Sequence, residues 1–315
     1  MELNMSNNQP LVSVIIPNYN HARFLDERMQ SVLGQTYQNI EVIILDDCSK
    51  DNSREVIEKY RNHPKVADIV YNDKNSGSPF RQWKKGMELA TGDVVWIAES
   101  DDHCETTFLE ELVRPLRDHD DAFIFCRSVK VDEDDKEFEL CQQTLPESRH
   151  WADGKTFIRE EMLAYTIVLN ASSAIFKKDL GLKAVDDCLD FRGSGDWLFF
   201  IRLAEMGGVD FVAHKLNYFR QFRASTTNAQ GSNGRAYVEN RRIFDYLRAQ
   251  HYMSASQRRR IRFFTIYQII YNHPNMERAA RRKALSAWHC HWYTLPIIRL
   301  SHRFFQWRTR NINEK

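Results

Sequence analysis

The sequence lacks several features that would place it in a common class of protein. No apolar run approaches the ~18–20 residues that a membrane-spanning helix requires. The N-terminal stretch MELNMSNNQP has neither a basic start nor an apolar core, so we expect no secretory signal. The six cysteines are scattered and include no CxxC pair, which is typical of reduced thiols. These absences predict a cytoplasmic protein without a disulfide framework.

Charge is nearly balanced over the whole chain but unevenly distributed along it. The net charge is +1, yet residues 235–315 contain 17 Lys and Arg against 4 Asp and Glu. The first 234 residues therefore carry net negative charge, and we expect the two parts to meet different partners. With 43% apolar and 28% charged residues, the 315-residue chain has the composition of a globular protein with a sizeable core.

The first hundred residues alternate short apolar runs with segments of helical periodicity. The apolar runs are LVSVII (11–16), IEVIIL (40–45), VADIVY (66–71) and DVVWIAE (93–99). Strands that are apolar on both faces are typical of a parallel sheet covered by helices on both sides. We therefore predict an α/β fold. Later elements are expected as helices near 107–118, 156–169 and 196–208, strands at 121–129 and 171–176, and an acidic hairpin at 132–139.

Polar residues follow three of these strands. PNYN (17–20) follows the first strand, DD (46–47) the second and SDD (100–102) the fourth. Ligands of parallel sheets bind at the carboxyl ends of the strands, so we expect these segments to converge on one edge. A lone acidic pair is typical of a turn or a helix cap. The alternative is a site for Mg²⁺ or Mn²⁺, which take carboxylate oxygens and share the ion with substrate phosphates.

Four segments carry a resemblance to a known family. They are VSVIIPNYN (12–20), EVIILDDCSKDNS (41–53), ELATGDVVWIAESDD (88–102) and GDWLFFIRL (195–203). In this order they resemble the successive motifs of family 2 glycosyltransferases, which use nucleotide sugars. The resemblance runs from about residue 11 to about residue 225. It implies the GT-A fold, a Rossmann-like, mostly parallel sheet flanked by helices.

The expected organisation has four parts. Residues 1–10 would form a flexible tail, residues 11–105 the nucleotide-sugar-binding half of the GT-A domain, and residues 106–234 its acceptor-binding half. Residues 235–315 are expected to form a mainly helical, basic and aromatic extension.

The resemblance implies roles for residues of the donor site. Pro17 and Tyr19 would hold the donor base, Tyr19 by stacking, and Asp47 would accept a hydrogen bond from the uracil of a UDP donor. Asp101 and Asp102 occupy the DxD-like position. Asp102 would bind a divalent metal, Mn²⁺ or Mg²⁺, directly, and Asp101 would bind the ribose or a metal-bound water. The metal would neutralise the leaving diphosphate.

The same resemblance implies a catalytic base at Asp196. Transfer with inversion is a single displacement, so the acceptor hydroxyl must lose a proton to a nearby carboxylate. Asp196 follows Gly193, Ser194 and Gly195 at the start of a predicted helix. A lone Asp there is typical of an N-cap, and the two roles can coexist. Asp46 is expected to shape the turn beside Asp47.

Three positions depart from the family pattern. Trp83 stands where many relatives have the arginine of an Ala-Arg-Asn run, so a contact with the donor phosphates would pass to Arg81 or Lys84. Phe222 stands where many relatives have a metal-ligating histidine. Cys48 replaces the usual turn glycine, and we interpret it as small and structural.

The basic extension has two open interpretations. Its segments RRRIRFF (258–264) and RLSHRFFQWRTR (299–310) suit either a solvated helical face or attachment to an anionic membrane surface. In the second case the chain would lie at the inner face of the cytoplasmic membrane. Nucleic-acid binding is not expected, because no nucleic-acid motif accompanies the charge.

These features together predict an inverting, metal-dependent glycosyltransferase. It would move a sugar from a nucleotide donor, UDP first and GDP or dTDP as alternatives, to a hydroxyl of a glycan or lipid-linked acceptor in surface polysaccharide biosynthesis. The alternative is a non-catalytic relative that binds a nucleotide sugar and acts as a scaffold. A nicotinamide-dependent oxidoreductase is disfavoured, since the turn after the first strand reads PNYNHA and not GxGxxG.

Overall fold

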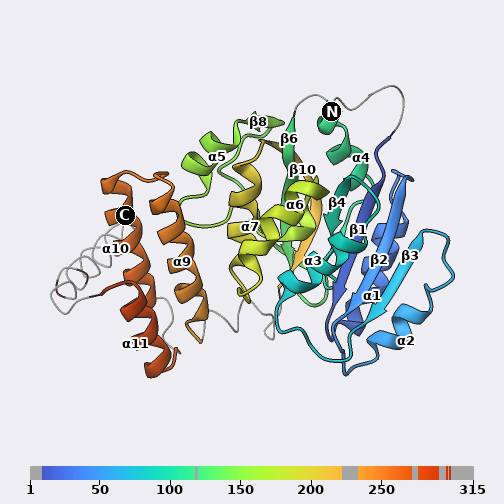
Figure 1. Cartoon of the computed structure of the whole chain (residues 1–315), viewed down its shortest axis with the longest axis horizontal. Helices are drawn as coiled ribbons and strands as arrows, with labels where there is room; N and C mark the ends of the chain where they lie inside the picture. Colours follow the sequence, from blue (N-terminus) through green and yellow to red (C-terminus); the bar gives the residue numbers. More distant parts are fainter. Residues whose placement is uncertain are drawn as a thin grey trace, which may run out of the picture. The chain divides into compact units, whose positions relative to one another are not determined.

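The computed structural model describes residues 9–117, 120–221, 233–271 and 276–290, together with Pro296 and Ile298. The chain forms two compact units, Met1–Phe222 and Arg223–Lys315. The first contains a sheet flanked by helices and the second contains helices (Figure 1). None of the helices in the described ranges has the length and apolar character needed to cross a membrane. The predicted tail falls outside these ranges except for its last two residues.

One sheet runs through the first unit. Its strand order is β3-β2-β1-β4-β9-β6-β10-β5, with β7 beside β6 and β8 beside β10. The strands are β1 (Val12–Asn18), β2 (Ile40–Asp46), β3 (Val66–Tyr71), β4 (Val94–Ile97), β5 (His103–Cys104), β6 (Asp121–Val131), β7 (Glu137–Leu140), β8 (His150–Ala152), β9 (Ala174–Lys177) and β10 (Gly208–Arg220).

Helices cover both faces of the first four strands, which pair in parallel. Alternate residues of β1 point to opposite faces. Val12, Val14 and Ile16 pack in one core with α1 (Ala22–Leu33) and α4 (Phe108–Val113). Ile15 faces α3 (Pro79–Leu89), where a Cβ on Gly86 would lie 2.4 Å from its side chain. A short helix, α2 (Ser53–Glu58), links β2 to β3. The predicted α/β fold is confirmed.

The second half of the sheet is mixed. β9 lies antiparallel between β4 and β6, and β6 pairs in parallel with β10. The acidic hairpin is confirmed as the β6–β7 turn. The helix expected over 156–169 is too long, since the observed helix α5 spans only Gly154–Glu161. The main-chain oxygen of Met162, the residue after it, accepts a hydrogen bond from Trp197 Nε1. The remaining helices are α6 (Lys178–Val185), α7 (Gly195–Ala204) and 3-10 turns at Pro115–Arg117, Ala171–Ser173 and Asp186–Cys188.

The second unit confirms a helical extension. It contains α9 (Arg235–Ala249), α10 (Ala255–Tyr271) and α11 (Arg278–Ala287). Trp288 is 2% exposed within this unit. Its ring packs on Phe244, and its Nε1 donates to the main-chain oxygen of Tyr237 at 2.7 Å. The segment RLSHRFFQWRTR (299–310) lies outside the described residues.

Candidate active site

Three strand ends meet at one edge of the sheet, as the sequence predicts. β1 and β2 are in register so that Asn18 pairs with Asp46, and Asn18 Nδ2 donates to Asp46 Oδ1 at 2.8 Å. β4 pairs with β1 on the other side, and the amide of Ala98 donates to the oxygen of Ile15 at 2.8 Å. The acidic segment after β4 therefore begins beside the loop after β1.

The loops after β1 and β2 are joined by hydrogen bonds. Asp46 Oδ2 accepts from the amide of Ser49 at 3.0 Å, and Ser49 Oγ accepts from the amide of Asn20 at 2.9 Å. The turn-shaping role predicted for Asp46 agrees with these contacts. Cys48 has a φ of 64°, in the left-handed region that favours glycine. This conformation explains why a glycine would be usual at this position.

Tyr19 and Pro17 differ in exposure. The Tyr19 ring is 42% exposed at the tip of the first loop, so one face of it is accessible to a flat ring. Pro17 is buried within β1, opposite Leu45. Stacking of a donor base on Tyr19 therefore stays a prediction, and the Tyr19 side chain is accessible for it. Pro17 contributes to the strand and not to an exposed surface.

The carboxylate of Asp47 already accepts hydrogen bonds from other residues of the protein. Its side chain is 6% exposed, and its carboxylate accepts from Asn72 Nδ2 at 2.7 Å, Gln82 Nε2 at 2.9 Å and both the amide and the Oγ of Ser76 at 2.8 Å. A carboxylate offers about four lone-pair sites. The predicted hydrogen bond to uracil would have to replace one of these partners. In this conformation Asp47 holds the loop before α3.

A chain of contacts links this loop to Asp196. Ser78, which precedes α3, donates from Oγ to the oxygen of Phe191 at 2.7 Å. A Cβ on Gly195 would lie 2.5 Å from the Phe80 ring, so only glycine allows this approach. Asp196 follows at the start of α7, partly exposed, with Oδ1 accepting from the amide of Trp197 at 2.8 Å. The candidate base thus lies on a segment packed against the start of α3.

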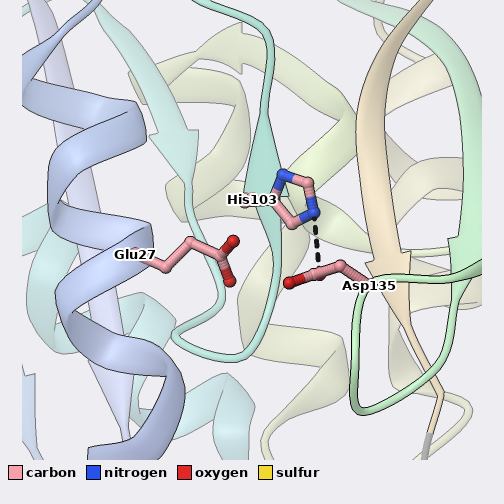
Figure 2. A group of neighbouring side chains, drawn as sticks. All are labelled: Glu27, His103 and Asp135. Carbon is pink, nitrogen blue, oxygen red and sulfur yellow. Dashed lines mark ion pairs between the residues drawn. The ribbon is translucent and has the colours of Figure 1, made fainter.

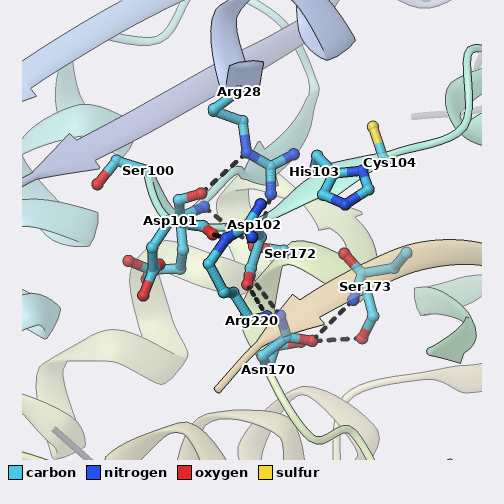
Figure 3. A network of polar contacts seen from close by, with 12 residues as sticks. Arg28, Ser100, Asp101, Asp102, His103, Cys104, Asn170, Ser172, Ser173 and Arg220 are labelled. Carbon is cyan, nitrogen blue, oxygen red and sulfur yellow. Dashed lines mark hydrogen bonds and ion pairs between the residues drawn. The ribbon is translucent and has the colours of Figure 1, made fainter. Parts of the chain in front are cut away.

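The role of Asp102 as a direct metal ligand stays a prediction, and the structure shows its carboxylate bound by other residues. It is 1% exposed, and Figure 3 shows it among Arg28, Asn170 and Arg220. Asn170 Nδ2 donates to its Oδ2 at 2.5 Å, the amide of Arg220 donates to its Oδ1 at 3.0 Å, and Arg28 Nη2 lies 3.9 Å away. Burial, followed by the charge of Asp101, raises the pKa of Asp102 above the usual value of an aspartate. In this conformation a metal ion would have to displace one of these partners to bind Asp102.

Asp101 has the accessible carboxylate of the pair. Its side chain is 20% exposed, and its Oδ1 lies 3.9 Å from Nδ1 of His21. His21 comes from the loop after β1, and its Nδ1 is 2.9 Å from Ser100 Oγ. Two ligands of one ion with bonds of about 2.0–2.1 Å lie about 3–4 Å apart. The carboxylate oxygen suits Mn²⁺ or Mg²⁺, and the imidazole nitrogen beside it suits Mn²⁺ better than Mg²⁺.

Trp83 and Glu99 form a pair that replaces an expected arginine contact. Trp83 is 3% exposed and donates from Nε1 to Glu99 Oε1 at 2.9 Å. Burial and then the charge of Asp101 raise the pKa of Glu99 to about 8. Trp83 is packed between the rings of Phe80 and Phe199. The indole of Trp83 therefore binds Glu99 at the end of β4, and it has no positive charge with which to bind a diphosphate.

A second cluster lies beside this strand end. Glu27, His103 and Asp135 have potential ligand atoms within 4.8 Å of one another (Figure 2). The guanidinium of Arg220 lies within this cluster, with Nη2 2.6 Å from Glu27 Oε2 and 2.6 Å from Asp135 Oδ1. A cation here would compete with a buried guanidinium. We therefore interpret the cluster as an ion-pair network and not as the metal centre.

Arg81 and Lys84, the candidates for the donor phosphates, pair with acidic residues of the 186–190 segment. Lys84 Nζ donates to Asp186 Oδ1 at 2.6 Å, and Arg81 Nη2 lies 3.8 Å from Asp190 Oδ1 with half of its side chain exposed. Their phosphate contacts remain predictions. Phe222 lies outside the described residues.

Sequence reasoning missed four residues that organise the site: His21, Arg28, Asn170 and Arg220. The sequence does contain a signal for Arg28, because this residue falls on the apolar face of α1 with Leu25 and Met29. A cation on that face requires a buried anion as its partner. Asn170 and Arg220 are 68 and 118 residues from Asp102 and carry no local signal.

Comparisons with known proteins show the family to which this chain belongs. The family model for glycosyl transferase family 2 matches residues 13–179. The glycosyltransferase TuaG of Bacillus subtilis (strain 168), assigned to teichuronic acid biosynthesis, is 36% identical over 121 residues. That match covers 38% of this chain and 48% of TuaG, so the chain spans about half the length of this relative.

Two solved structures share the fold. One is Staphylococcus aureus TarS 1-349 in complex with UDP-GlcNAc, with a TM-score of 0.59 over 88% of this chain and 71% of that chain. The other is the mannosyltransferase PcManGT from Pyrobaculum calidifontis in complex with GDP-Man and Mn²⁺, with a TM-score of 0.55 over 95% and 81%. Both are 18% identical to this chain, so they show the fold alone.

Proposed function

Because this chain belongs to glycosyltransferase family 2, we propose that it transfers a sugar, with inversion, from a nucleotide donor to a hydroxyl of a glycan or lipid-linked acceptor. The observation that carries the proposal is the meeting of the ends of β1, β2 and β4 at one edge of the sheet, where Asp101 is accessible beside His21. The setting we propose is surface polysaccharide biosynthesis, supported by the assignment of TuaG.

The proposed donor is a UDP-sugar, with a GDP-sugar as the alternative. Tyr19 stacks on the base, since its ring is exposed beside the strand ends. Asp47 holds the loop at Ser76 and presents the edge of that loop to the nucleotide. Of the two solved structures described above, one is in complex with UDP-GlcNAc and the other with GDP-Man, so both nucleotides belong in the test.

We propose Asp101 as the residue that holds a divalent metal, with His21 beside it. The fit rests on the accessible carboxylate and on the imidazole 3.9 Å away. A bound Mn²⁺ or Mg²⁺ would neutralise the diphosphate leaving group. Asp102 has a structural role in this proposal. It pairs with Arg28 and accepts hydrogen bonds from Asn170 and from the amide of Arg220.

Asp196 is the proposed general base. It takes the proton of the acceptor hydroxyl as that oxygen attacks the anomeric carbon, and partial exposure at the start of α7 leaves it open to an acceptor. Arg81 and Lys84 of α3 are the proposed contacts for the donor phosphates. On donor binding, Arg81 would leave Asp190 and Lys84 would leave Asp186 to pair with a phosphate.

The test is release of free nucleotide from a panel of UDP-, GDP- and dTDP-sugars in the presence of Mn²⁺. We expect release from one donor class and its loss in Asp196→Asn, with the circular dichroism spectrum unchanged. Asp179→Asn, an exposed carboxylate paired with Lys183, is the matched control and keeps full activity. Nucleotide binding without turnover of any donor would favour the scaffold alternative. Equal turnover in wild type and Asp196→Asn would refute the assigned base.

A further inference from the structure

Helix α10 presents apolar side chains on two sides. Ile266 and Ile269 are 2% and 0% exposed and face the interior of the second unit. Phe263 and Phe264 are 38% and 56% exposed. A helix that packs on one side only is expected to be polar on the other. The exposed phenylalanines therefore require a separate explanation.

Two arginines lie next to these rings. Arg259 and Arg260 are exposed and precede Phe263 and Phe264 by four residues each, so the four side chains share one face of the helix. We call Arg259, Arg260, Phe263 and Phe264 the Arg-Phe face.

The cations of this face have no anion in the part of the chain that the structure describes. Neither Arg259 nor Arg260 makes a side-chain hydrogen bond or ion pair there, and α10 itself contains no acidic residue. The contrast with α9 is direct, because Arg241 and Arg248 both pair with Asp245. Two arginines of α9 thus have an acidic partner on their own helix, whereas α10 offers none.

We propose that the Arg-Phe face binds the surface of an anionic phospholipid bilayer. Phenylalanine has no polar atom, so its ring gains by leaving water for the boundary between headgroups and acyl chains. Arginines beside such rings pair with lipid phosphates, and each cation near an anionic surface contributes about 1 kcal/mol. An anionic bilayer therefore offers a partner both to the phenylalanine rings and to the arginines of the Arg-Phe face.

A second copy of this chain fits the face less well. Two copies meeting through the same face would bring four unpaired arginines together, and like charges at short range repel. Nucleic acid shares the phosphate chemistry, and it is an outcome of the test. The inference does not depend on the donor site, so it can fail while the proposed glycosyl transfer stands.

The experiment is co-sedimentation of the full chain with vesicles. One set contains phosphatidylcholine alone and the other contains phosphatidylcholine mixed with phosphatidylglycerol, each at low and at high salt. We expect binding to the anionic vesicles, weakened by salt. Arg259→Gln/Arg260→Gln should weaken it roughly 25-fold, at about fivefold for each charge. Phe263→Ser/Phe264→Ser should weaken it by about tenfold and also reduce the binding that survives high salt.

Matched controls come from the first unit. Lys74→Gln/Lys155→Gln removes the same charge from two exposed lysines, and Phe138→Ser removes a ring that is 55% exposed. Both controls should sediment like the wild type. Equal binding to the two vesicle types, no binding to either, or equal losses in the controls would each overturn the proposal. So would self-association that the Arg-Phe variants abolish, or an oligonucleotide that binds the face in preference to vesicles.

Discussion

Arg220 donates a hydrogen bond from Nε to the main-chain oxygen of Asp101 at 2.8 Å, although 119 residues separate them. The same guanidinium donates to the oxygen of Asp132 at 3.0 Å and to Glu27 Oε2 at 2.6 Å. Its side chain is fully buried, over the ring of Phe24. The end of β10 therefore fixes the main chain of the residue that we assign to the metal, together with α1 and the β6–β7 turn.

Replacement of Arg220 tests this arrangement. Arg220→Gln removes a fully buried cation whose partners Glu27 and Asp135 are 40% and 45% exposed, and it takes a donor from the main-chain oxygens of Asp101 and Asp132. The cost is about 1–3 kcal/mol, mostly from those unpaired oxygens, because solvent screens the two exposed carboxylates. We expect a lower midpoint in urea-induced unfolding with an unchanged slope. Arg114→Gln, at an arginine with 65% of its side chain exposed, is the control and should change the free energy of unfolding by less than about 0.5 kcal/mol. Equal midpoints for the two variants would rule out the structural role of Arg220.

Trp83→Phe tests the pair with Glu99. Phenylalanine keeps most of the packing against Phe80 and Phe199 but removes the donor to Glu99 Oε1. A partly buried carboxyl without its donor costs about 1–3 kcal/mol. We expect that loss in chemical denaturation, and a smaller loss when Glu99→Leu, which has no acceptor, is already present. Additive effects of the two substitutions would show that the hydrogen bond contributes nothing.

Cys48→Gly tests the strained turn after β2. Cys48 has a φ of 64°, which costs an L-residue roughly 1–2 kcal/mol, and glycine relieves this strain. Glycine also loses about 0.5–1 kcal/mol through the greater freedom of the unfolded chain. The net expectation is a gain of up to about 1 kcal/mol in the free energy of unfolding. A loss of similar size would mean that the contact of the thiol with the oxygen of Asp73 outweighs the strain.

Glu41 predicts a dependence of stability on pH. Burial alone would raise its pKa, but hydrogen bonds from Ser13, Thr91 and Gly92 outweigh burial and hold the pKa below the usual 4.5. A carboxyl whose pKa is lower in the folded state stabilises it above the unfolded pKa and loses that contribution as pH falls.

Glu41→Gln should therefore cost about 1–2 kcal/mol at about pH 7. The difference from wild type should shrink below about pH 4. Thermal unfolding of both proteins across this range measures the difference. A gap that stays constant with pH would contradict the assignment of the stabilisation to the ionised carboxylate.

The first half of the fold could be predicted because most of its strands are apolar runs and the first three are each followed by a helix. VSVII and EVIIL admit few other interpretations. The second half could not be predicted in the same way. β10 mixes apolar residues with Asp210, His214 and Asn217, and its partners β5, β6 and β8 come from distant segments. Local pattern carries no information about such pairing.

The site shows the same division. The sequence places Asp101 and Asp102 at one strand end, but it does not tell which carboxylate faces solvent. That choice is made by Arg28, Asn170 and the amide of Arg220, which surround Asp102 and leave Asp101 accessible. Likewise, Asp47 was expected to contact a ligand, and the structure fills its oxygens with partners from 72–82.

The measurement that tests the account most directly is isothermal titration of UDP and GDP into the purified protein, with and without Mn²⁺. Wild type is compared with Asp101→Asn and Asp102→Asn. The account predicts that Mn²⁺ strengthens binding of one nucleotide, and that Asp101→Asn abolishes this gain while leaving the unfolding midpoint unchanged. Asp102→Asn should lower that midpoint, because Arg28 loses its anion, and keep the gain from Mn²⁺. Loss of the gain in Asp102→Asn with its retention in Asp101→Asn would contradict the assignment and return the metal to Asp102.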